Sequence, residues 1–170
     1  ALSAFSADHT GRAALLEAAP LAGLCALLRL LRATCVRPGA FCYLLITTLA
    51  NLALNERAAR DLLAEGAAEL LVEFVQSRTV TLQPPSLLSV LGLRPARRVR
   101  ANMGGIATRA LINMAMVVPR GSGRNAVRNA GALEKLQELH WVTEDHAVRM
   151  IAGDAIRLLG GAQPNLQATG

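Results

Sequence analysis

A short apolar motif occurs twice in this chain, each time within a run of helix-forming residues. Residues 49–53 read Leu-Ala-Asn-Leu-Ala, and residues 111–115 read Leu-Ile-Asn-Met-Ala. An arginine- and asparagine-bearing segment and a turn of small residues follow each copy. This order is typical of helical repeat proteins, in which each unit is too small to fold alone and stacks on its neighbours. The repetition therefore predicts a stack of similar helical units.

The composition favours a core of aliphatic side chains. Of the 170 residues, 52% are apolar and only 3% are aromatic, which suits close helix packing better than a sheet sandwich or barrel. Cys25, Cys35 and Cys42 lack the spacing of metal ligands, and we interpret them as buried thiols in a reducing compartment. We expect an intracellular, cytoplasmic protein, with a cilium or an organelle as alternatives. A chain that begins with Ala1 and shows no signal peptide is expected to be a processed or partial product.

Local start and stop signals divide this single domain into repeat-like units. Asn55 can cap a helix over residues 58–63, and Gly66 can end it in the left-handed conformation. Ala130-Gly131 gives the same stop signal further along the chain. The predicted units span residues 7–54, 55–117 and 121–162, followed by a tail over residues 163–170.

Two further segments carry a family resemblance. Residues 60–67 read Arg-Asp-Leu-Leu-Ala-Glu-Gly-Ala, and residues 125–132 read Asn-Ala-Val-Arg-Asn-Ala-Gly-Ala. Both are similar to the first-helix signature of armadillo repeats, and the two asparagine motifs are similar to the third-helix signature. The resemblance covers most of residues 7–162, with HEAT-like repeats as the near alternative. It implies an all-α, right-handed α-solenoid of armadillo-like three-helix repeats.

One segment departs from the repeat pattern. Gly66 and Gly131 are 65 residues apart, whereas the armadillo-type period is roughly 40. The surplus lies between Arg78 and Arg100 and contains three prolines and a glycine. We therefore predict an inserted loop over residues 79–100, with a short helix at residues 87–91.

The charge is distributed unevenly. The net charge is +6, and the 60 residues from Phe74 to Leu133 contain no aspartate or glutamate. That stretch contains nine arginines, and the densest run of them lies in the insert: Arg94, Arg97, Arg98 and Arg100. Such a one-signed field attracts acidic protein surfaces or polyanions. No membrane span is expected, because the uncharged stretch over residues 38–55 is interrupted by proline, glycine, threonine and asparagine.

The family resemblance also implies a partner-binding groove lined by the third helices. In armadillo proteins the signature asparagine often bonds the backbone of an extended peptide, and Asn51 and Asn113 match that position. The same amide could instead bond the backbone of a neighbouring repeat, and both alternatives stay open. Members that bind basic nuclear-localisation peptides carry a tryptophan four residues earlier, where this chain has Thr47 and Arg109. We therefore expect partners with acidic or extended segments.

No catalytic motif is present in the sequence. His140 and His146 are six positions apart, which does not place two ligands on one helix face as a metal site requires. We predict a protein that is not an enzyme and uses no cofactor or metal. The favoured function is a protein-binding scaffold or adaptor subunit of a larger multi-subunit complex. The alternative is a basic accessory protein of a ribonucleoprotein assembly, which would contact the RNA backbone through the arginines of the insert.

Overall fold

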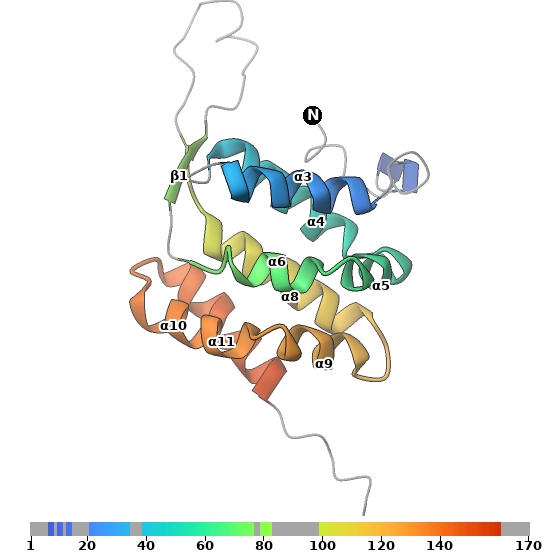
Figure 1. Cartoon of the computed structure of the whole chain (residues 1–170). Helices are drawn as coiled ribbons and strands as arrows, with labels where there is room; N and C mark the ends of the chain where they lie inside the picture. The colour runs from blue at the N-terminus through green and yellow to red at the C-terminus, as the bar shows by residue number, and fades with distance from the viewer. Residues whose placement is uncertain are drawn as a thin grey trace, which may run out of the picture.

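The computed structural model describes residues 7, 8, 10, 11, 13, 14, 21–34, 39–76, 79–82 and 99–160. The described helices form three layers, which follow one another from the blue N-terminal end to the red C-terminal end of Figure 1. The first layer is α3 (Leu21–Thr34) and α4 (Ala40–Leu52). The second layer is α5 (Glu56–Ala64), α6 (Ala67–Val72) and α8 (Met103–Val117), and the third is α9 (Ser122–Asn129), α10 (Ala132–Val142) and α11 (His146–Gly160).

Helix ends follow the local signals of the sequence. The Asn55 side chain accepts a hydrogen bond from the backbone N–H of Ala58 at 3.1 Å, which satisfies an orphan donor in the first turn of α5. Gly66 has a φ of 74° and Gly131 a φ of 79°, so both occupy the left-handed region that glycine enters without strain. These two positions stop one helix and start the next, as predicted.

The core runs through all three layers along α4, α8 and α11. Helix α4 packs against α8, and α8 packs against α11. Leu49, Leu111 and Leu159 are fully or almost fully buried in one continuous apolar cluster. Because the core is continuous, the position of each long helix depends on the helix of the next layer.

The burial predicted for the cysteines is confirmed for the two that the structure describes. Cys25 and Cys42 are both buried. Burial raises the pKa of the Cys25 thiol, and the nearby Arg29 lowers it by less. A buried, neutral thiol behaves as a small apolar core group. Cys35 lies outside the described residues.

Two glycines at the start of α8 allow close packing within the second layer and against the third. A Cβ on Gly104 would lie 2.4 Å from the backbone oxygen of Gln76, and a Cβ on Gly105 would lie 3.0 Å from Val148 Cγ2. Gly123 in α9 makes a third close contact of this kind. A Cβ there would lie 2.4 Å from the carbonyl oxygen of Met114.

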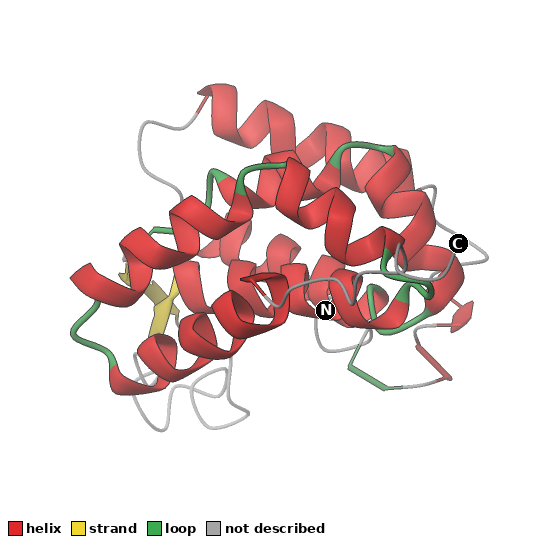
Figure 2. Ribbon diagram, turned by 90° about the horizontal axis from the view of Figure 1, so that it is seen from below, coloured by secondary structure: helices red, strands yellow, loops and turns green. Residues whose placement is uncertain are grey.

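The insert differs from the predicted loop at both of its ends. Residues Thr79–Leu82 form β1 and residues Val99–Asn102 form β2, which pair antiparallel from Thr79 opposite Asn102 to Leu82 opposite Val99. Figure 2 shows these strands at one side of the helical stack. The expectation of a simple loop was wrong for these residues, because pairing with a distant strand satisfies their backbone groups. The short helix expected at residues 87–91 lies outside the described residues.

The uncharged stretch over residues 38–55 contains α4, and most of the apolar side chains of α4 belong to the core. Within the described part of the chain, no helix is both long and apolar enough to cross a bilayer.

Candidate partner-binding surface

The four helical site residues predicted from sequence lie on two helices that pack against each other. Thr47 and Asn51 are one turn apart on α4, and Arg109 and Asn113 are one turn apart on α8. We call these four residues the third-helix surface. Three of them are half-buried, and Arg109 is exposed to solvent.

Asn113 ties the second layer to the first. Its Nδ2 donates a hydrogen bond of 2.8 Å to the carbonyl oxygen of Ala50 in the last turn of α4. That carbonyl needs an outside donor, because the following backbone N–H groups of Ala53, Leu54 and Asn55 donate to other carbonyl oxygens. Of the two alternatives for this amide, the bond to a neighbouring backbone is therefore present in the structure.

Thr47 of α4 is held by a bond within its own helix. The hydroxyl of Thr47 donates to the carbonyl oxygen of Tyr43 at 2.8 Å, one turn earlier. That bond uses the only hydrogen of the hydroxyl, so Thr47 can offer a partner only an acceptor. Asn51 is half-buried on the same side of α4.

The basic side chains divide into two groups. Arg109 projects from α8, and among the described residues no carboxylate forms an ion pair with it. Arg100 is exposed on β2, which leads directly into α8. Arg94, Arg97 and Arg98 lie outside the described residues, so the structure does not place them relative to the third-helix surface.

Changing Asn113 to alanine is expected to lower the free energy of unfolding by about 1 to 2 kcal/mol, because the Ala50 carbonyl loses its donor. Changing Asn113 to aspartate should cost more, since a carboxylate oxygen would face the carbonyl oxygen without a proton between them. Chemical denaturation followed by circular dichroism measures both changes. The matched control is Asn125→Ala on the exposed side of α9, which should change stability by less than about 0.5 kcal/mol. Equal effects at positions 113 and 125 would show that the bond to Ala50 is unimportant.

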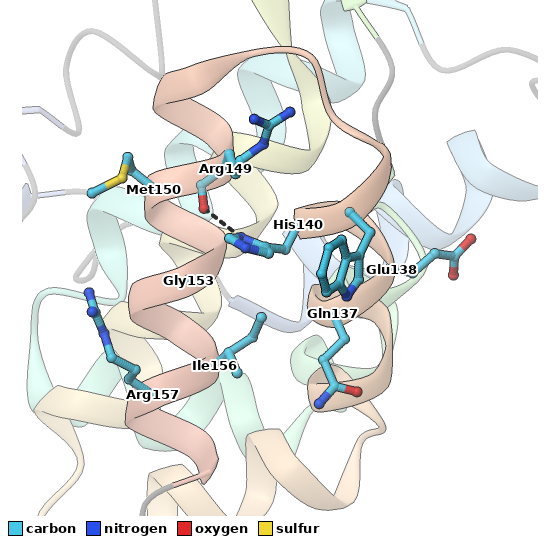
Figure 3. Close-up of a pocket in the computed structure, with 9 residues that line it drawn as sticks. Gln137, Glu138, His140, Arg149, Met150, Gly153, Ile156 and Arg157 are labelled. Atoms are coloured by element: carbon cyan, nitrogen blue, oxygen red, sulfur yellow. Dashed lines mark hydrogen bonds between the residues drawn. The ribbon is translucent and has the colours of Figure 1, made fainter.

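An open groove between α10 and α11 was not among the sequence predictions. Its volume is about 790 Å³, and Figure 3 shows its lining side chains: Gln137, Glu138, His140, Trp141, Arg149, Met150, Gly153, Ile156 and Arg157. Trp141 is 81% exposed, although a tryptophan in a folded domain is usually well covered. The sequence contained one signal for this surface, because Trp141 falls outside the buried stripe of Leu136 and Leu139 on α10.

No metal centre can be built from the described residues, which include no group of three or more histidine, cysteine, aspartate or glutamate side chains suited to hold an ion. His140 is instead a structural group. Its Nδ1 lies 3.0 Å from the carbonyl oxygen of Arg149 and joins α10 to α11.

Comparison with known proteins identifies the fold. No family model matches this chain, and no curated protein matches its sequence. Among solved structures, the chain is similar to the designed armadillo repeat protein YIII(Dq)4CqI, with a TM-score of 0.64 and 19% sequence identity. The match covers 93% of this chain and 55% of the designed protein. The armadillo-like, all-α solenoid predicted from the two signatures is therefore confirmed.

Proposed function

We propose that this chain is a non-enzymatic protein-binding scaffold that holds an acidic, extended segment of a partner on its third-helix surface. The armadillo-like fold supports a protein-binding role in general terms. The observation that carries the proposal is the exposed Arg109, which has no carboxylate partner among the described residues and lies one turn from Asn113.

Arginine suits this role because its planar guanidinium can donate two parallel hydrogen bonds to a carboxylate. The amide of Asn113 complements it. The bond to Ala50 uses one of the four hydrogen-bonding positions that a primary amide offers, so the amide can still bond a peptide backbone. A backbone contact beside a charge contact would favour extended chains with acidic side chains.

The insert supplies a second contact in this proposal. Arg100 is exposed on β2, and Arg94, Arg97 and Arg98 precede it in a stretch without acidic residues. An acidic partner would be steered toward this field before it docks, which raises the association rate more than the final affinity. Two separate contacts fit an adaptor subunit of a larger complex.

The test is a selection of short random peptides by display on the purified chain, followed by affinity measurements on the selected peptides. We expect them to be enriched in aspartate and glutamate. Arg109→Glu should weaken their binding at least about tenfold, equivalent to about 1.4 kcal/mol, because an attraction becomes a repulsion. Binding should also weaken as salt is raised, because exposed charges are screened.

The matched control is Arg128→Glu, which reverses an exposed arginine on α9 and should leave peptide affinity within about twofold. Circular dichroism of both variants checks that the fold is intact. Selected peptides without acidic enrichment would contradict the proposal. It would also fail if single-stranded poly(U) RNA bound more tightly than any selected peptide and lost its affinity only when the insert arginines were removed.

A further inference from the structure

The groove between α10 and α11 combines exposed apolar side chains with contacts that fix its two helices, as an unoccupied protein interface would. Trp141 of α10 is among its lining residues, and Met150, Gly153 and Ile156 follow one another along α11 on its other side (Figure 3). The bond from His140 to the carbonyl oxygen of Arg149 joins the two helices beneath it. Trp141 is further supported by an edge-on contact with the His140 ring, with 6.0 Å between ring centroids. These contacts order the groove before any partner binds, which lowers the entropic cost of docking.

The internal repetition of the chain shows what this surface is in the stack. Helices α8 and α11 share one burial pattern: residues 103, 107, 110 and 114 are buried in α8, and residues 148, 152, 155 and 159 are buried in α11. A shift of 45 positions therefore aligns the two helices, and it places Met150, Gly153 and Ile156 at the positions of Gly105, Thr108 and Leu111.

In the second layer these equivalent positions are covered. Gly105, Thr108 and Leu111 are buried, and α8 packs against α11 of the third layer. Helix α6 shows the same relation to α10. Gly66 and Gly131 align the two helices, so Val72 and Val75 correspond to Gln137 and His140, and both valines are buried. The groove is thus the end of the stack where a following layer would pack.

The opposite end of the stack shows the complementary feature. The two asparagine motifs align α4 with α8 at a shift of 62 positions, so Phe41 and Leu44 correspond to Met103 and Ile106. Helical spacing puts Ile106 on the same side of α8 as Asn113, which is the side that contacts α4. Met103 is buried and Ile106 is partly buried, whereas Phe41 is 57% exposed and Leu44 is also exposed.

We infer that copies of this chain associate end to end, with the α10–α11 groove of one copy docked on the α3–α4 face of the next. The contact would continue the layer-on-layer interface that already joins α8 to α11 within one chain. The interface is heterologous, because two different surfaces meet, and such contacts extend beyond a dimer unless the rotation closes a ring. Trp141 is the anchor, since buried tryptophans dominate the energy of protein interfaces. This inference does not depend on the third-helix surface.

Self-association and the binding of an acidic peptide should depend on salt concentration in opposite directions. Each copy carries a net charge of +6, so two copies repel each other at low ionic strength. Added salt screens that repulsion and leaves apolar burial intact. Self-association should therefore strengthen with salt, whereas binding of an acidic peptide should weaken.

The test is sedimentation analysis of the full chain over the micromolar range, with fluorescence of its single tryptophan recorded in parallel. The average mass should rise with concentration beyond that of a dimer, and the tryptophan emission should shift to the blue as Trp141 is covered. Trp141→Glu and Phe41→Glu should each remain monomeric. Leu54→Glu, at an exposed leucine between α4 and α5, should behave as the unmodified chain.

Mixing the Phe41→Glu and Trp141→Glu variants gives the decisive measurement. Phe41→Glu retains an intact groove, and Trp141→Glu retains an intact α3–α4 face, so an equimolar mixture should form dimers and nothing larger. A mixture that stays monomeric would overturn the inference, as would an unmodified chain that stays monomeric throughout the range. Circular dichroism confirms that each variant is folded. Arg109→Glu should leave the association unchanged, so failure of one proposal is distinguishable from failure of the other.

Discussion

Replacing Gly104 with alanine is expected to lower the free energy of unfolding by about 3 kcal/mol. The new Cβ would lie 2.4 Å from the backbone oxygen of Gln76 and 3.1 Å from Leu139 Cδ1. A backbone oxygen cannot rotate away as the end of a side chain can. Helix α8 would therefore have to move away from the segment that follows α6. The higher helix propensity of alanine offsets only about 1 kcal/mol of this cost. Denaturant unfolding followed by circular dichroism measures the change.

The matched control for this prediction is Gly153→Ala in α11. Its Cβ would meet the His140 ring at 3.5 Å, an ordinary contact, so only the gain in helix propensity remains. We expect Gly153→Ala to leave the free energy of unfolding unchanged or raise it by up to about 1 kcal/mol. Two variants of equal stability would mean that α8 can shift without cost and that the close approach at Gly104 is not required.

Features that depend on local chemistry could be predicted from the sequence. Asn55 caps a helix because its side chain reaches a backbone N–H three residues away, and Gly66 stops one because only glycine enters the left-handed region at no steric cost. The alternation of the two signatures also gave the order of the layers, since each signature reports one helix of a repeating unit. These inferences need no knowledge of distant contacts.

Features that depend on distant pairing could not be predicted in the same way. Residues 79–82 become a strand only because residues 99–102 pair with them, and the prolines between the two segments point to a loop. The partner of Asn113 is 63 residues away, and an amide can equally bond a peptide or a neighbouring helix. The exposure of Trp141 likewise depends on which helices cover α10.

Replacing Leu111 with alanine is expected to cost about 4 kcal/mol of unfolding free energy, within the range measured for buried leucines that leave a cavity. Leu111 is 1% exposed at the middle of α8, which packs against both α4 and α11. The cavity therefore weakens contacts to both neighbouring layers. Because a repeat stack is stabilised by the contacts between adjacent units, we also expect unfolding to become less cooperative. Thermal and denaturant unfolding, each followed by circular dichroism and by tryptophan fluorescence, test both effects.

The matched control for Leu111→Ala is a substitution on the exposed side of the same helix. Met116 lies on the same helix but is 66% exposed, so Met116→Ala removes a similar apolar volume from the surface. It should change the free energy of unfolding by less than about 0.5 kcal/mol. For Leu111→Ala the two probes should separate, because the only tryptophan is in the third layer while circular dichroism reports all the helices. Coincident transitions at nearly unchanged stability would show that the layers do not depend on α8, and the third-helix surface built on it would lose its structural basis.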